Sequence, residues 1–95
     1  MPKQRLVSYV GFALKSNSVV FGLDNLKKSY KKVFGVLIDT FASENTKNQV
    51  KYFCETRKID LKEIKNLDEI FGTINCKVVG LTNKELSKQI LECED

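Results

Sequence analysis

The run Val33-Phe34-Gly35-Val36-Leu37-Ile38, closed by Asp39 and Thr40, decides the fold of this chain. Its apolar residues are continuous, whereas a strand that is exposed on one face alternates apolar and polar residues. The run therefore predicts a strand buried on both faces, at the centre of a sheet that helices cover.

The segments on both sides of this run alternate between helical and strand patterns. Apolar residues spaced three and four apart predict helices, and short β-branched or alternating segments predict strands. The predicted strands are 18–21, 33–38, 76–81 and a short edge strand at 59–61. The first two helices are predicted at about 4–15 and 23–30. The third and fourth should start after the N-cap candidates Ser43 and Asn66, and Gly72 should end the fourth. The fifth should follow the capping-box pattern Thr82 to Glu85.

Each longer helix carries an apolar stripe that predicts its buried face. The chain should form one domain, 1–95, because 95 residues suffice for one core but not for two. Alternating helices and strands indicate an α/β fold, a three-layer α/β/α sandwich around a small mixed four-stranded sheet. The predicted helical core residues are Leu6, Val10, Ala13, Leu14, Leu26, Tyr30, Val50, Phe53, Cys54, the stem of Arg57, Leu86, Ile90 and Leu91.

Composition excludes some classes of protein and favours others. Hydrophobic residues make up 42% of the chain and charged residues 29%, which is too apolar for disorder. No stretch approaches a membrane span, and residues 1–15 lack a signal-peptide pattern, so we expect a cytoplasmic protein. The net charge of +4 favours polyanionic partners. The widely spaced Cys54, Cys76 and Cys93 and the absence of histidine predict reduced thiols, with no metal site or cofactor.

A candidate binding corner precedes the central run, at Phe21-Gly22-Leu23-Asp24-Asn25-Leu26-Lys27-Lys28. Here a short strand turns through Gly22 into a helix, where unpaired N–H groups, a close backbone approach and lysines favour RNA. The cations of this corner are Lys27, Lys28, Lys31 and Lys32.

Across residues 6–91, the order of several short motifs resembles the kink-turn RNA-binding ribosomal-protein superfamily, the large-subunit seven-Ae and thirty-e type. The motifs are Val19-Val20-Phe21-Gly22 followed by Asp24 and Lys28, then 42–46 (Ala-Ser-Glu-Asn-Thr), 67–72, and 77–82 (Lys-Val-Val-Gly-Leu-Thr). The chain is most similar to the short bacterial members of this group.

The resemblance implies a ribosomal-protein-like RNA-binding protein, part of a ribonucleoprotein in translation, that grips a sharply bent RNA at tandem G·A pairs. The family motif Gly-x-Asn-Glu-x-x-Lys stands here as Gly22 to Lys28, with Asp24 and Asn25 at the two middle positions. Gly22 would admit the RNA backbone, while Asp24, Asn25 and Lys28 would read base edges. The resemblance adds Ile74 and Asn75, from the loop before the last strand, as neighbouring contacts.

Each of these features also has a structural interpretation. The lysines can form a solvated helix face, and Asp24 and Asn25 can cap the helix. Asp39 and Thr40 end a central strand, where α/β proteins place catalytic groups, but a surface turn is the favoured interpretation. Phe41 can stack on a base, although packing onto the sheet is the commoner arrangement.

We do not expect an enzyme or a small-molecule substrate. No cysteine has a histidine partner, and Gly22 stands where a phosphotransfer module of this size would carry its thiol. The alternative to an RNA-binding protein is a fold relative that has lost RNA affinity and serves as a protein-interaction module.

Overall fold

The central strand predicted from the apolar run is β2, Gly35–Asp39, and all five of its residues are buried. It starts two residues later than predicted and includes Asp39. The strand order is β1-β4-β2-β3, so β2 has neighbours on both sides. Continuous apolarity therefore identified an interior strand, as we expected.

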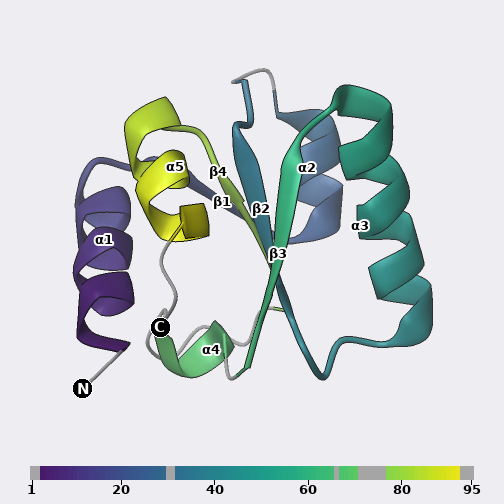
Figure 1. Cartoon of the computed structure of the whole chain (residues 1–95). Helices are drawn as coiled ribbons and strands as arrows, with labels where there is room; N and C mark the ends of the chain where they lie inside the picture. Colours follow the sequence, from purple (N-terminus) through teal and green to yellow (C-terminus); the bar gives the residue numbers. More distant parts are fainter. Residues whose placement is uncertain (1–2, 30–31, 66, 71–76, 93–95) are drawn as a thin grey trace.

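A computed structural model describes residues 3–29, 32–65, 67–70 and 77–92, excepting the side chains of 3–6, 68 and 69. Helices and strands alternate almost throughout (Figure 1). The elements are α1 (Lys3–Lys15), β1 (Val19–Phe21), α2 (Leu23–Lys28), β2 (Gly35–Asp39), α3 (Glu44–Arg57), β3 (Asp60–Ile64), α4 (Leu67–Ile70), β4 (Val78–Leu81) and α5 (Lys84–Glu92).

The sheet is mixed, which confirms the predicted class. Strand β3 lies parallel to β2 and forms one edge, and β4 lies antiparallel to both β2 and β1. The predicted edge strand at 59–61 is longer in the structure, Asp60–Ile64, because five residues pair with β2. The carboxyl ends of β1, β2 and β3 and the start of β4 therefore lie together in one row of strand ends. This row is the Gly22 edge of the sheet, and the opposite row of strand ends is the far edge.

Helices cover both faces of the sheet, as the sandwich prediction requires. Helices α1 and α5 lie on one face and α2 and α3 on the other, while α4 lies at the edge where β3 ends (Figure 1). Because side chains alternate along a strand, Leu37 of β2 joins the α1/α4/α5 core, and Val36 and Ile38 join the α2/α3 core.

The predicted buried faces are confirmed in part. Val10 and Ala13 of α1 are buried, but Leu14 is 38% exposed, so its assignment to the core was wrong. Leu14 lies seven residues after Val7, which is 48% exposed, so both residues are on a flank of α1 that faces solvent. Arg57 is exposed, Leu86 and Leu91 are half-buried, and Leu26, Val50, Phe53, Cys54 and Ile90 are buried. Tyr30 and the side chain of Leu6 lie outside the described residues.

The helix caps were predicted with mixed success. Ser43 caps α3, because its Oγ accepts a hydrogen bond from the Thr46 N–H at 3.2 Å. Helix α5 is capped by Asn83, whose Oδ1 accepts from the Leu86 N–H at 3.0 Å, and not by Thr82 as the capping-box pattern suggested. Asn83 directly precedes Lys84, the first helical residue, which puts it at the N-cap. Asn66 and Gly72 lie outside the described residues.

Cys54 is a free, buried thiol in α3, as predicted. Burial, with a further contribution from the negative charge of Asp60, raises the pKa of this thiol to about 11. Cys54 is therefore protonated at neutral pH and is suited to packing rather than to nucleophilic chemistry. Cys76 and Cys93 lie outside the described residues. Among the described helices, none is both long and apolar enough to span a bilayer.

Ser87 of α5 is a buried residue that the apolar stripe did not predict. It is 1% exposed, and its Oγ has no hydrogen-bond partner among the described residues. It lies against Gly35, where an added Cβ would overlap the Ser87 Oγ. The two small residues therefore let α5 approach β2 closely.

We predict that Ser87→Ala raises the free energy of unfolding by about 1 kcal/mol, because it removes a buried hydroxyl that forms no hydrogen bond and introduces a better helix former. Urea denaturation followed by circular dichroism would measure this change. The matched control is Ser18→Ala: the Ser18 hydroxyl is also buried but lies 2.8 Å from the Ser16 hydroxyl, so its removal should destabilise the protein. A loss of stability in Ser87→Ala would contradict the prediction.

Candidate functional site

The Gly22 turn is open and requires glycine for its backbone conformation. Gly22 has φ 87° and ψ 148°, and an added Cβ would meet no atom within 4 Å. Positive φ is costly for other residues, whereas the open space means that crowding does not exclude them. The Gly22 N–H donates to the Val78 carbonyl at 2.9 Å, which joins the turn to the start of β4. The corner is therefore held to the sheet and remains accessible.

Asp24, Asn25 and Lys28 share the exposed face of α2, while Leu26 points into the core. The Asn25 Nδ2 donates to the Phe21 carbonyl at 2.8 Å, which ties α2 to β1. Neither Asn25 nor Asp24 caps the helix, contrary to the structural interpretation: the N-cap is Gly22, without a side-chain cap bond. Asp24 and Lys28 are four residues apart and hence are neighbours on the helix surface. The amide oxygen and the second N–H of Asn25 are then left to meet a ligand, together with Asp24 and Lys28.

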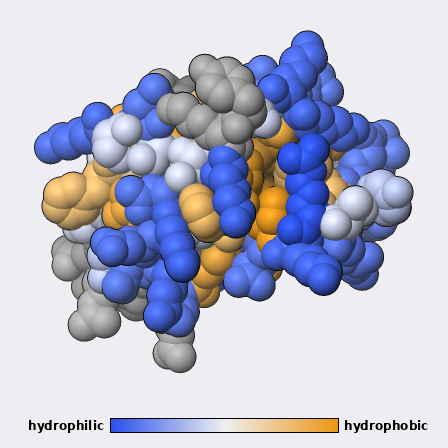
Figure 2. All heavy atoms as spheres, turned by 90° about the horizontal axis from the view of Figure 1, so that it is seen from above, coloured by the Kyte–Doolittle hydropathy of each residue, from blue (hydrophilic) through white to orange (hydrophobic). Residues whose placement is uncertain are grey.

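The predicted lysines do not all lie at the Gly22 corner. Lys27 lies on the flank of α2 that faces α3, and the Lys32 Nζ lies 5.4 Å from the centre of the Phe34 ring. The Phe34 N–H bonds the Leu81 carbonyl, at the opposite end of β4 from Val78. Lys32 is therefore at the far edge of the sheet from Gly22. Figure 2 looks down on that edge and shows apolar atoms between hydrophilic side chains. Lys31, Ile74 and Asn75 lie outside the described residues.

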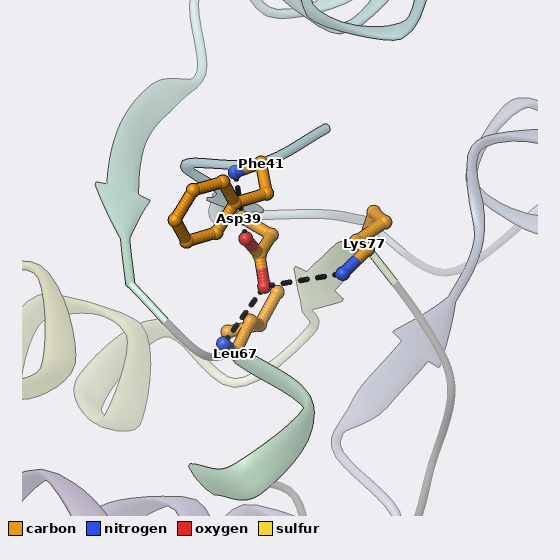
Figure 3. A network of polar contacts seen from close by, with 4 residues as sticks. All are labelled: Asp39, Phe41, Leu67 and Lys77. Carbon is orange, nitrogen blue, oxygen red and sulfur yellow. Dashed lines mark hydrogen bonds and ion pairs between the residues drawn. The ribbon is translucent and has the colours of Figure 1, made fainter. Parts of the chain in front are cut away.

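Asp39 is the buried centre of a network of polar contacts (Figure 3). It lies at the same edge of the sheet as Gly22, because the Asp39 N–H donates to the Lys77 carbonyl and the Gly22 N–H to the Val78 carbonyl. Its Oδ1 accepts from the Phe41 N–H at 2.8 Å, and its Oδ2 accepts from the Leu67 N–H at 3.0 Å. The Lys77 Nζ lies 3.8 Å from Oδ2. Asp39 thus connects the end of β2 to the start of α4 and to the residue before β4.

The interpretation of Asp39 as part of a surface turn was wrong, because this side chain is 1% exposed. Burial by itself would raise the pKa of the carboxyl. The hydrogen bonds from the Phe41 and Leu67 N–H groups and the charge of Lys77 outweigh burial and lower the pKa below its ordinary value of 3.8. The carboxylate is therefore ionised and paired at neutral pH, which suits a structural role.

Phe41 is 70% exposed and does not pack onto the sheet, contrary to the commoner arrangement that we favoured. Its N–H is held by Asp39, and the Asp39 N–H bonds the Lys77 carbonyl next to Val78. Phe41 therefore lies at the Gly22 edge, two strands away from Gly22 in the strand order. An exposed aromatic ring in this position is available for stacking.

Comparison with known proteins supports the fold and gives no information on function. No family model matches the chain, and no curated protein matches it. Solved structures do match, among them a protein with unknown function from Bacillus halodurans C. That structure has a TM-score of 0.83 and 21% sequence identity, over 92% of this chain and 93% of that chain. The two chains therefore share a fold along nearly their whole length, and identity at this level carries no function across.

Proposed function

We propose that this chain is a cytoplasmic RNA-binding protein that recognises a sharply bent, kink-turn-like RNA at the Gly22 corner. The observation that carries the proposal is the accessible corner itself. There an open glycine turn, the exposed face of α2 and the start of β4 meet at one edge of the sheet. Recognition is by shape and a few base-edge contacts, and the protein contributes no covalent chemistry.

The chemistry of the corner suits RNA bases and phosphates. Gly22 offers a backbone that another backbone can approach closely. The Asp24 carboxylate can accept from the N–H groups of a guanine edge, and Lys28 can donate to guanine O6 or N7. Phe41 adds an exposed ring at the same edge for an unstacked base. Lys32 contributes only where the RNA extends along α2 to the far edge.

Fluorescence anisotropy titrations with a labelled kink-turn RNA and a straight duplex of equal length, at two salt concentrations, test this function. We predict that the kink-turn RNA binds more tightly at both salt concentrations. Lys28→Ala should weaken that binding about tenfold, because it removes a charged donor at a base edge. The matched control is Lys88→Ala on α5, which lies on the opposite face of the sheet and should change affinity less than about twofold.

Two results would contradict the proposal. Equal, weak binding of both RNAs that modest salt abolishes would indicate nonspecific electrostatic attraction. Wild-type affinity in Lys28→Ala would remove the assignment of the corner, even if RNA still bound elsewhere.

A second candidate function is a protein-interaction module, and the exposed apolar residues of α1 favour it. Val7 is 48% exposed, Phe12 61% and Leu14 38%. Val7 and Leu14 are seven residues apart and therefore lie on the same side of the helix. Failure of both RNAs to bind, together with self-association that Val7→Ser and Leu14→Ser abolish in sedimentation, would favour this candidate.

A further inference from the structure

A groove lies between α2 and α3, away from the Gly22 turn. Its volume is about 430 Å³, within the range of small-ligand sites. One lysine of α2 and a row of α3 side chains line it. The residues on which the argument rests are Lys27, Asn48, Gln49, Tyr52, Phe53 and Arg57.

The groove carries positive charge and aromatic surface together. Lys27 and Arg57 supply two cations, and no carboxylate belongs to the lining among the described residues. The Arg57 Cζ lies 4.6 Å from the centre of the Phe53 ring, a cation–π distance that places the guanidinium beside the floor of the groove. Tyr52 is 72% exposed, whereas Phe53 is 6% exposed and forms part of the floor. From the sequence, only the stem of Arg57 was predicted to pack, on the buried face of its helix, because apolar spacing does not show that α2 lies beside α3.

We propose that this groove binds an unpaired nucleotide of the same RNA, a refinement that rests on the proposed function. The base stacks on Tyr52, the phosphate pairs with Arg57 and Lys27, and the amides of Asn48 and Gln49 reach the base edge. Two cations, with no carboxylate among the described lining residues, favour a phosphate-bearing ligand over an apolar protein helix. Lys27 follows Asp24 by three residues, about 5 Å along the helix axis, so a strand leaving the corner reaches the groove directly.

Anisotropy titrations with three RNAs test the proposal. One is a blunt kink-turn RNA, and the others carry four unpaired adenosines at the 5′ or the 3′ end. One of the two extensions should tighten binding by the wild-type protein at least about fivefold, the gain that stacking of one base gives. Tyr52→Ala and Arg57→Ala should remove that gain and leave affinity for the blunt RNA within about twofold.

Two matched variants act as controls. Tyr52→Phe keeps the ring and should keep the gain. Lys51→Ala removes one exposed cation from α3 outside the groove, and should also keep it. Tyr52 and Arg57 are both exposed, so these substitutions should leave the circular dichroism spectrum unchanged, and Arg57→Ala should lower the Tm only slightly, through the lost contact with the Phe53 ring.

The outcomes separate this proposal from the proposed function. If the blunt RNA binds through Lys28 and neither extension adds affinity, the groove proposal is overturned and the corner stands. If the blunt RNA does not bind, free tetra-adenylate is titrated and the tyrosine ring signals are followed by NMR. Binding that Tyr52→Ala abolishes supports the groove, and no binding overturns it. A dimer that Tyr52→Ala dissociates in sedimentation also overturns it, because a second copy then occupies the groove.

Discussion

Replacing Asp39 with alanine is expected to lower the free energy of unfolding by about 3 kcal/mol, because two backbone N–H groups lose the acceptor that satisfies them. The Leu67 N–H is buried, and the Phe41 N–H is partly buried. For a domain of this length the loss corresponds to a decrease in Tm of roughly 12–24 °C. Differential scanning calorimetry and urea titration would measure the two quantities independently.

Glu63→Ala is the matched control for this substitution. Glu63 is also a carboxylate on the sheet, but its partner Lys47 lies 3.6 Å away and the Glu63 side chain is 52% exposed. An exposed pair of this kind contributes little, so we expect a change of less than about 0.5 kcal/mol. Equal effects of the two substitutions would show that the Asp39 network does not stabilise the fold.

The pH dependence of stability gives a second measure of the same network. The pKa of Asp39 is lowered in the folded protein, so ionised Asp39 stabilises the native state above the ordinary value of 3.8. That contribution is lost as the pH falls through the folded pKa. Asp39→Asn cannot titrate, so the stability difference between wild type and Asp39→Asn should be constant near neutral pH and shrink below about pH 4. A difference that stays constant down to pH 2 would contradict this assignment.

The fold was predictable because its signals are local. The apolar run at 33–38 identified the interior strand, and spacing along α1 and α3 identified most of their buried residues. Ser43 capped its helix as its residue type indicated. Errors arose where two local signals competed: Thr82 and Asn83 are both good caps, and only the observed start of α5 at Lys84 distinguishes them.

The candidate sites were less predictable because they depend on segments far apart in the chain. Asp39 is satisfied by Leu67, 28 residues away, so its burial could not be inferred from the end of an apolar run. The groove requires α2 and α3 to lie side by side, which no periodicity reports. Lys32 follows the lysines of α2 in sequence, yet the chain carries it to the opposite edge of the sheet beside Phe34. The exposed ring at the Gly22 edge did have a signal in the sequence, because Phe41 is an aromatic residue just past the central strand.

Gly80 is another residue whose surroundings depend on a segment far away in the chain. It lies in β4, where Leu26 of α2 packs directly onto it: an added Cβ would overlap the Leu26 side chain and approach the Val33 side chain to 3.5 Å. Leu26 is fully buried, so it cannot turn outward to make room. Gly80→Ala should therefore lower the free energy of unfolding by about 2 kcal/mol through overpacking.

The matched control is Gly11→Ala in α1, where an added Cβ meets nothing within 4 Å. The same chemical change should there raise stability by about 1 kcal/mol, because alanine favours a helix interior. Chemical denaturation of both variants measures the contrast. A stabilising Gly80→Ala would mean that α2 does not pack on β4 as the structure shows.

A double-mutant cycle tests the contact between Gly80 and Leu26, the residue that anchors α2. Leu26→Ala alone leaves a cavity and should cost about 3 kcal/mol, but it also makes room for a methyl group at position 80. The Gly80→Ala/Leu26→Ala variant should therefore be more stable than the sum of the two single effects predicts, by about 1 kcal/mol or more. Because Leu26 anchors the helix that carries Asp24 and Lys28, Gly80→Ala should also weaken kink-turn RNA binding at temperatures where the protein is still folded, whereas Gly11→Ala should not. Additive stabilities would show that the two residues do not contact, and unchanged affinity would show that the position of α2 does not determine binding.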